Sequence, residues 1–315
     1  MATTQASAPG KVILFGEHAV VYGQPAIAVP VSQSRARATV SDSQEPGVVI
    51  DLPDLKTVLR LGEADPDDAF VRAVEVVREA GDLHSLPALH ILVESDIPSA
   101  SGMGSGAATA TALIRALIEH LDLAHLASAA QVAALTYRVE EIHHGTPSGI
   151  DNTVVAYEQP VYFQRRQAGN LIETFTAGRP LHLLIADTGI RSSTREVVGD
   201  VRRQWQENAP YFEALFAECG RIAVAARHAI EAGMVDRVGA LMVQNQALLQ
   251  KMTVSCEKLD NLVKVAMLHG AEGAKLSGGG RGGNMIALAE PAHMEELQHV
   301  LKRAGARRVL AAIVG

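Results

Sequence analysis

Charged side chains flank a short apolar strand near the start of this chain. Residues 8–23 read Ala-Pro-Gly-Lys-Val-Ile-Leu-Phe-Gly-Glu-His-Ala-Val-Val-Tyr-Gly. A buried strand needs Val-Ile-Leu-Phe but gains nothing from polar neighbours. Because proline and glycine interrupt the strand pattern on both sides, we expect Lys11, Glu17 and His18 near the strand ends, where side chains can reach a cleft.

A glycine-rich loop between an expected strand and an expected helix is the second candidate site. Residues 98–108 read Pro-Ser-Ala-Ser-Gly-Met-Gly-Ser-Gly-Ala-Ala. Glycines let a backbone approach a phosphate closely, and the helix that follows points its positive dipole end at the same place. The loop therefore favours polyphosphate binding, although a tight turn explains it equally well when it is taken alone. It matches neither the Walker pattern nor a dinucleotide fingerprint.

Two carboxylates follow this loop. Glu140 lies on a helix expected at 128–143, one position off its apolar stripe and so at the edge of the core. Asp151 comes near the end of the glycine-broken run Gly-Thr-Pro-Ser-Gly-Ile-Asp-Asn at 145–152. A solvated helix carboxylate is the alternative for Glu140, and a capping residue is the alternative for Asp151.

A second glycine-rich run lies near the C-terminus. Residues 273–284 read Gly-Ala-Lys-Leu-Ser-Gly-Gly-Gly-Arg-Gly-Gly-Asn, and such a run can form an anion-binding concavity. Lys275 is either a phosphate contact or a surface lysine at a strand edge. Arg281 either adds a charge near a bound polyphosphate or faces solvent.

Two further segments carry polar residues of interest. In the run Asp-Thr-Gly-Ile-Arg-Ser-Ser-Thr at 187–194, Arg191 and the neighbouring hydroxyls, Ser192 included, would suit a carboxylate. Ser255 precedes an expected helix, and a helix N-cap is the favoured interpretation of this residue.

Strands and helices must position these residues, and the two types mix along the whole chain without an internal repeat. Strands are expected at 11–15, 26–31, 35–40, 48–52, 90–94, 181–187, 284–289 and 308–314. Helices are expected at 68–80, 107–121, 128–143, 259–269 and 292–304, with mostly helical chain from 195 to 250. The domain boundary is placed between residues 179 and 180.

The composition fits a two-domain globular protein. The chain has 315 residues, of which 48% are hydrophobic and 20% charged. A formal net charge of −7 argues against a nucleic-acid partner. With only Cys219 and Cys256, a disulfide framework and a zinc cluster are both excluded. No signal peptide or membrane-spanning segment is recognised, so we expect a cytoplasmic protein without a membrane partner.

Taken in order, these motifs resemble the signatures of the GHMP kinases, the superfamily named after galactokinase, homoserine kinase, mevalonate kinase and phosphomevalonate kinase. The tail Gly-Glu-His-Ala-Val-Val-Tyr-Gly and the run at 145–152 are most similar to the mevalonate kinases within it. The resemblance implies an α+β fold with an N-terminal ribosomal-protein-S5-domain-2-like domain at 1–179. It also implies a ferredoxin-like C-terminal domain at 180–315, with the active site between the two.

The resemblance further implies ATP-dependent phosphorylation of the 5-hydroxyl of mevalonate, with ATP and mevalonate as substrates and Mg²⁺ as cofactor. Asp151 would be the catalytic base, supported by Lys11, and Glu140 and Ser105 would hold the metal. The implied substrate-binding residues are Glu17, His18, Arg191 and Ser192. The implied ATP-binding residues are Pro98, Ser101, Gly102, Met103, Gly104, Ser105, Gly106 and Ala107. A homodimer is expected.

Two positions depart from the family pattern. Gly106 stands where a serine commonly ligates Mg²⁺, and Arg281 replaces a glycine. Three alternatives stay open: another kinase of the superfamily acting on phosphomevalonate or a sugar, a diphosphomevalonate-decarboxylase-like enzyme, and a nucleotide-binding regulator that has lost catalysis.

Overall fold

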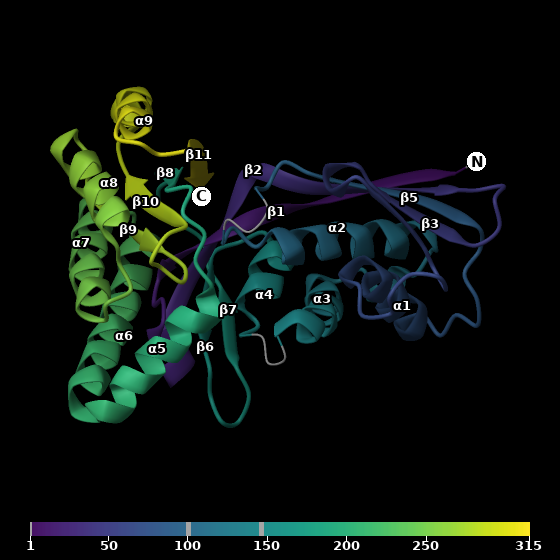
Figure 1. Ribbon diagram of the computed structural model, residues 1–315, viewed down its shortest axis with the longest axis horizontal. Helices are drawn as coiled ribbons and strands as arrows, with labels where there is room; N and C mark the ends of the chain where they lie inside the picture. The colour runs from purple at the N-terminus through teal and green to yellow at the C-terminus, as the bar shows by residue number, and fades with distance from the viewer. Residues whose placement is uncertain (1, 99–101, 145–147) are drawn as a thin grey trace. The chain divides into compact units, whose positions relative to one another are not determined.

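The computed structural model describes residues 2–98, 102–144 and 148–315, which form two compact units (Figure 1). The first unit comprises Met1–Lys11, Ser34–Ser99 and Met103–Glu158, and the second comprises Val12–Gln33, Ala100–Gly102 and Gln159–Gly315. The first sequence motif is therefore divided, because Lys11 belongs to the first unit and Glu17 and His18 to the second. The predicted domain boundary at 179/180 and the predicted interdomain active site stay predictions.

The first unit contains strands on which three helices pack. Its strands are β1 (Thr3–Phe15) and β2 (Pro25–Asp42), which both continue into the second unit, and β3 (Val48–Leu52), β4 (Thr57–Arg60) and β5 (Leu89–Ser95). They pair in the order β4-β3-β5-β2, with β1 also paired to β2. The β3–β5 pair is parallel, whereas β3–β4 and β2–β5 are antiparallel.

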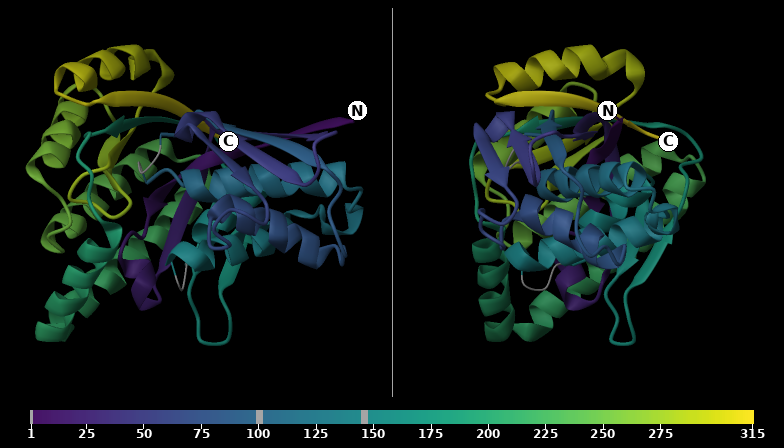
Figure 2. Two further views of the ribbon diagram at one scale, coloured as in Figure 1. Left: turned by 45° about the vertical axis from the view of Figure 1, so that its right-hand side comes forward. Right: turned by 90° about the vertical axis from the view of Figure 1, so that its right-hand side faces the viewer.

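The helices of this unit are α1 (Ala69–Ala80), α2 (Ser105–His120), α3 (Ala129–His144) and α4 (Ile150–Tyr157). Three of the four were predicted within about two residues, and α4 was not predicted. Figures 1 and 2 show α1, α2 and α3 on one face of the strands. Side chains cap two of these helices at their N-termini, since the Asp68 carboxylate accepts the Phe70 N–H at 2.8 Å and the Ser128 hydroxyl accepts the Gln131 N–H at 3.3 Å.

The second unit contains an antiparallel sheet of β8 (Leu181–Asp187), β9 (Gly273–Ser277), β10 (Asn284–Leu288) and β11 (Arg308–Val314), in the order β11-β8-β10-β9. Ser277 pairs with Asn284 at the end of the β9–β10 hairpin, so the C-terminal glycine run forms its loop. The helices are α5 (Thr194–Glu207), α6 (Ala209–Glu231), α7 (Val235–Lys251), α8 (Glu257–Leu268) and α9 (Met294–Arg303). A short hairpin, β6 (Val161–Gln164) and β7 (Leu171–Thr174), pairs with the beginning of β2.

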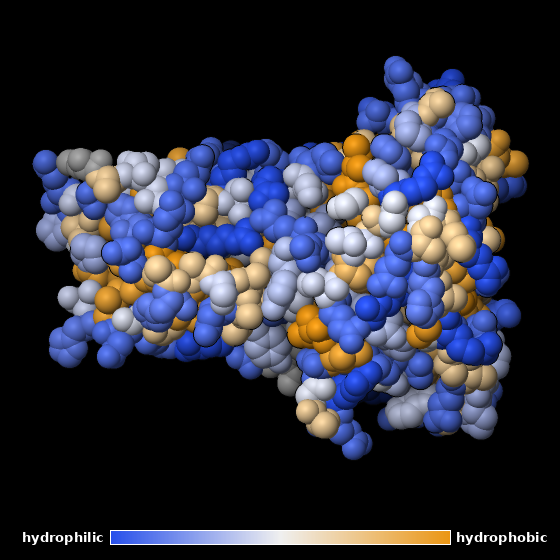
Figure 3. Space-filling model, turned by 180° about the vertical axis from the view of Figure 1, so that it is seen from behind, coloured by the Kyte–Doolittle hydropathy of each residue, from blue (hydrophilic) through white to orange (hydrophobic). Residues whose placement is uncertain are grey.

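Four 3₁₀ turns complete the described elements: η1 (Ala19–Tyr22), η2 (Pro53–Leu55), η3 (Ala124–Leu126) and η4 (Pro291–His293). Within the described ranges, no helix combines the length and apolar character needed to cross a bilayer. Figure 3 shows one face of the molecule, on which hydrophilic side chains dominate and apolar side chains gather in small groups.

Candidate active site

Lys11 and Asp151, which the family resemblance places together, form an ion pair in the first unit. Lys11 lies in β1 and is 5% exposed. Its Nζ lies 2.9 Å from Oδ1 of Asp151, whose side chain is 32% exposed. Asp151 stands in the first turn of α4, where the positive end of the helix dipole favours a carboxylate. The pair thus joins a buried ammonium to a carboxylate that is open to a ligand.

The N-terminus of α2 lies beside this lysine. The Lys11 N–H donates to the Met103 carbonyl at 2.9 Å, and a Cβ on Gly104 would lie 2.9 Å from Cγ of Lys11. Gly104 is the N-cap of α2 with a φ of +69°, and no described side chain caps the helix there. The N–H groups of the first turn and the Lys11 ammonium therefore create a place where an anion can bind.

Glu140 of α3 is the third charged group of this cluster. Its carboxylate accepts the backbone N–H of Asn152, while its buried Oε2 has no hydrogen-bond partner among the described residues. Burial and then the charge of Asp151 raise the pKa of Glu140 to about 8, and Lys11 opposes this shift. Two carboxyl groups thus share one lysine, and Lys11 is the cation that lies beside Glu140 among the described side chains.

The other residues of the predicted nucleotide loop differ in exposure. Pro98 and Ser105 are half-buried, Gly102 and Gly106 are exposed, and Met103 and Ala107 are buried. Ser101 lies outside the described residues. A Cβ on Gly106 would meet no described atom within 4 Å, so a side chain fits there. Binding of ATP by this loop stays a prediction.

In the second unit, Glu17 forms a wholly buried ion pair with Lys275 of β9. Both side chains are 0% exposed, and Lys275 Nζ also donates to the Leu276 carbonyl at 2.6 Å. Burial lowers the pKa of Lys275, and the Glu17 charge opposes that shift. The interpretation of Lys275 as a surface lysine is wrong, because β9 is buried along its whole length. Substrate contact by Glu17 stays a prediction.

His18 is held against the glycine loop of the β9–β10 hairpin. Its Nε2 lies 2.9 Å from the Gly279 carbonyl oxygen, and because a carbonyl can only accept, Nε2 carries the proton. Nδ1 is then an acceptor, and it is buried without a hydrogen-bond partner in the described part of the chain. Burial lowers the pKa of His18 to about 4, so the ring is neutral at pH 7.

Arg281 fastens the same loop to its surroundings. Its backbone N–H donates to the Val254 carbonyl at 2.7 Å, and its Nε donates to the Thr253 carbonyl at 3.1 Å. The guanidinium also forms an ion pair with Asp200 of α5 and is 34% exposed. Arg281 therefore does more than face solvent, and its predicted contact with a polyphosphate stays a prediction.

Arg191 and Ser192 are exposed in the segment between β8 and α5, and their binding of substrate is still a prediction. The expectation for Ser255 is wrong, because Cys256 is the N-cap of α8. The Ser255 hydroxyl donates instead to Oδ1 of Asp260 at 2.6 Å.

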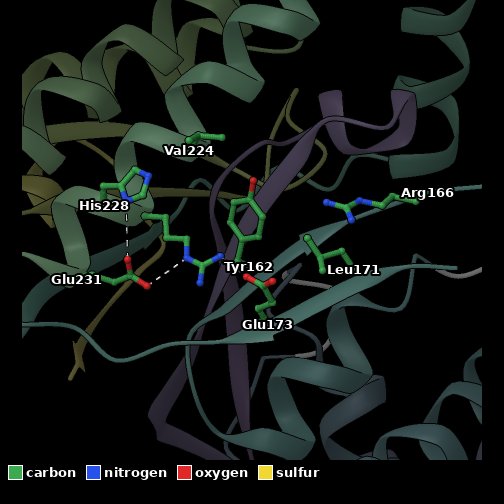
Figure 4. Close-up of a pocket in the computed structure, with 8 residues that line it drawn as sticks. Tyr162, Arg166, Leu171, Glu173, Val224, His228 and Glu231 are labelled. Atoms are coloured by element: carbon green, nitrogen blue, oxygen red, sulfur yellow. Dashed lines mark hydrogen bonds and ion pairs between the residues drawn. The ribbon is translucent and has the colours of Figure 1, made fainter. Parts of the chain in front are cut away.

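Figure 4 shows a hollow of about 430 Å³ in the second unit, between the β6–β7 hairpin and α6. It is lined by Tyr162, Arg166, Leu171, Glu173, Val224, Arg227, His228 and Glu231. The Arg227 guanidinium lies 4.9 Å from the Tyr162 ring centroid and forms ion pairs with Glu173 and Glu231. The charged groups of this hollow thus largely neutralise one another.

Two residues of functional interest were not predicted from the sequence: Lys275 as the partner of Glu17, and Asn152 as the backbone donor to Glu140. A lysine inside the apolar run Ala-Lys-Leu was the available signal for the first, because a charge in a buried strand requires a partner. The second depends on how α4 packs on α3, which no spacing in the sequence reveals.

Comparison with known proteins covers most of the chain. Residues 68–159 match the GHMP kinases N terminal domain, and residues 226–307 match the GHMP kinases C terminal domain. The mevalonate kinase of Pyrococcus abyssi is 35% identical, over 98% of this chain and 95% of that protein. The mevalonate kinase of Methanothermobacter thermautotrophicus is 32% identical, over 90% of this chain and 89% of the relative.

Solved structures agree with this assignment. The L. major mevalonate kinase in complex with R-mevalonate has a TM-score of 0.85 and 31% identity, covering 98% of this chain and 95% of that one. The Methanococcus jannaschii mevalonate kinase shares the fold with a TM-score of 0.85, at 24% identity over 100% and 99% of the two chains. The predicted two-domain GHMP kinase fold is therefore confirmed, and the chain belongs to the mevalonate kinase family of the GHMP kinases.

Proposed function

We propose that this chain transfers the γ-phosphoryl group of ATP to the 5-hydroxyl of mevalonate. Family membership supports this function. The observation that carries the proposal is the 2.9 Å ion pair between Lys11 and Asp151, placed beside the N-terminus of α2, where no described side chain caps the helix. The pair supplies a base and a fixed positive charge, which are the parts that phosphoryl transfer to an alcohol needs.

In this proposal Asp151 accepts the proton of the 5-hydroxyl. The hydroxyl oxygen forms its bond to the γ-phosphorus while the bond between that phosphorus and the bridging oxygen of ADP breaks. Lys11 orients the Asp151 carboxylate and stabilises the negative charge that develops on the attacking oxygen. Because Lys11 is buried, its charge is screened little by solvent.

The loop before α2 and the first turn of that helix bind the phosphates in our proposal. Glycines at 102, 104 and 106 allow the backbone to approach phosphate oxygens, and the helix dipole favours their charge. Met103, Ser105 and Ala107 would contribute backbone N–H groups, and Pro98 and Ser101 would flank the nucleotide.

A Mg²⁺ ion fits the Glu140 cluster. The buried Oε2 of Glu140 has no hydrogen-bond partner among the described residues, and the neighbouring Asp151 carboxylate contributes a negative charge. Mg²⁺ prefers oxygen ligands and needs few from the protein, so Glu140 and the Ser105 hydroxyl would hold it together with ATP oxygens and water. When bound, the ion supplies positive charge to the phosphate oxygens. Among described residues, no set of three or more His, Cys, Asp or Glu could hold a metal ion.

The acceptor side would be formed by His18, Arg191 and Ser192, together with Glu17. Nδ1 of His18 accepts no hydrogen bond from the described residues and suits a substrate hydroxyl. The exposed guanidinium of Arg191 suits the carboxylate of mevalonate. The predicted homodimer and cytoplasmic location are further proposals, and light scattering on the purified protein tests the first of them.

The test of the function is coupled ADP release with Mg²⁺ and ATP. Mevalonate, phosphomevalonate, galactose and homoserine are supplied in parallel as acceptors. We expect turnover with mevalonate alone. Turnover with only one of the other acceptors would retain the kinase chemistry and overturn the substrate. Nucleotide binding without turnover on any acceptor would favour a regulator that has lost catalysis.

A further inference from the structure

Three contacts in the second unit join the Gly-Glu-His segment at residues 16–18, together with the strand before it, to β9 and its loop. The Lys275 ammonium pairs with the Glu17 carboxylate, and both side chains are fully buried. The Ser277 hydroxyl donates to the Ile13 carbonyl at 2.8 Å, and His18 Nε2 donates to the Gly279 carbonyl at 2.9 Å. Residues more than 250 positions apart are thus held together by one ion pair and two hydrogen bonds.

The segment held in this way has an unfavourable backbone conformation. His18 has a φ of +59°, a region that residues with a Cβ rarely adopt, and Gly16 has a φ of +91°. A Cβ on Gly16 would lie 2.4 Å from the Pro25 carbonyl oxygen, so the backbone is also tightly packed. Such a conformation persists only where the surroundings fix it. The contacts from Lys275, Ser277 and Gly279 supply that fixation.

Helix α6 also packs close to the segment at residues 16–18. The turn η1, which follows His18 directly, packs on α6. The buried Cys219 of that helix is close enough to Glu17 for the carboxylate charge to contribute to the raised pKa of its thiol. A Cβ on Gly220 would lie 2.2 Å from the side chain of Gln24. Glu17 therefore lies in the interior of the unit. If the charge of Lys275 were removed, the segment around Glu17 would have to change its conformation.

We propose that Lys275 is a positioning residue for acceptor binding. By pairing with Glu17 it holds residues 16–18 in the conformation that presents His18 to the acceptor, and it contacts no substrate itself. This inference rests on the proposed function, in which His18 binds the acceptor. Lys275 is suited to the role because its ammonium donates hydrogen bonds to two acceptors, the Glu17 carboxylate and the Leu276 carbonyl.

The test combines kinetics with hydrogen exchange in three variants. Lys275→Met keeps the length of the side chain and removes its charge. Ser277→Ala removes one hydrogen bond and is the milder variant should Lys275→Met fold poorly. Leu297→Ala is the matched control, because this 0% exposed leucine lies on α9 and its loss destabilises the same unit through a cavity. Steady-state constants are measured well below the melting temperature of each variant.

In Lys275→Met we expect the KM for mevalonate to rise about tenfold while the KM for ATP stays within about twofold. Ser277→Ala should show the same split with a smaller rise. A residue that only stabilises the fold would lower the active fraction and leave both KM values unchanged, as we expect for Leu297→Ala. Unchanged KM values in both Lys275→Met and Ser277→Ala would overturn the proposal.

Hydrogen exchange decides the question without any substrate. Peptides covering residues 13–22 should exchange at least tenfold faster in Lys275→Met than in the wild-type chain, with β8 as the internal reference. Equal acceleration of residues 13–22 and β8, as global opening would give in Leu297→Ala, would contradict the positioning role. If the wild-type chain fails to phosphorylate mevalonate, the proposed function falls, while the exchange result still tests whether Lys275 holds this segment.

Discussion

Two lysine–carboxylate pairs in this chain have the same chemistry and opposite surroundings. In the first unit, Lys11 and Asp151 are 6% and 32% exposed in their side chains, and their atoms lie 2.9 Å apart. In the second unit, Lys275 and Glu17 are both 0% exposed. The first pair stands beside the N-terminus of α2, which no described side chain caps, whereas the second joins the buried strand β9 to the Gly-Glu-His segment that precedes η1.

The difference in exposure suits the first pair to catalysis and the second pair to a structural role. A catalytic base must lie within reach of the group that it deprotonates. Asp151 meets this condition because about a third of its side chain is exposed. A fully buried pair cannot meet it, but loss of one partner leaves an uncompensated charge in the interior, which is strongly destabilising. The open pair is therefore expected to control rate, and the closed pair to control stability and geometry.

The largest expected effect comes from removing the base in the open pair. Asp151→Asn keeps the size of the side chain but cannot accept the proton, so we expect kcat to fall by about 10²- to 10⁴-fold. The melting temperature should change little. Coupled ADP release checks the rate, and Asp42→Asn, which alters another paired carboxylate of the same unit, serves as the control. Activity of Asp151→Asn within a few-fold of wild type would remove this residue from the catalytic role.

The same substitution in each lysine tests directly whether the two pairs differ in function. Lys275→Met should lower the free energy of unfolding by about 3–5 kcal/mol, because the Glu17 carboxylate stays fully buried while the ammonium that faces it is lost. Lys11→Met should lower it less, since Asp151 can be solvated, yet it should reduce kcat more. Urea unfolding gives the unfolding free energy of each variant, and coupled ADP release gives the kcat of each. Equal losses of stability in the two variants would show that exposure does not distinguish the pairs.

A smaller effect is expected from pH in the second unit. The pKa of His18 is lowered to about 4 in the folded chain, against 6.5 for an unperturbed histidine. Between these values the unfolded chain binds a proton that the folded chain does not. The unfolding free energy is therefore undiminished above pH 6.5 and falls as the pH drops towards 4, by about 3 kcal/mol in total.

His18→Gln isolates this contribution, because glutamine can still donate to the Gly279 carbonyl but does not titrate. Urea unfolding between pH 7 and pH 4 should give a flatter dependence for the variant than for the wild-type chain. Parallel curves for the two proteins would contradict a buried neutral imidazole at this position.

Local patterns predicted α1, α2 and α3, and the family resemblance implied the open pair, whereas neither predicted the closed pair. The limits of α1 were confirmed to within about one residue, because apolar period and capping act over a few residues. The short strands β6 and β7 were not predicted, since four residues carry too little pattern. The Glu17–Lys275 pair joins positions 258 apart, and only the packing of β9 against the first motif brings them together.

The smallest expected effect tests the departure at Gly106, in the first turn of α2 beside the open pair. Gly106→Ala should raise the unfolding free energy by about 0.5–1 kcal/mol, because glycine is a poor helix residue and space for a Cβ exists there. Gly106→Ser should also raise stability, though less. Only the serine adds an oxygen ligand, so it alone should lower the Mg²⁺ concentration needed for half-maximal activity. An equal shift in Gly106→Ala would mean that helix stability, and not metal coordination, sets that concentration, and would leave Glu140 as the main protein ligand.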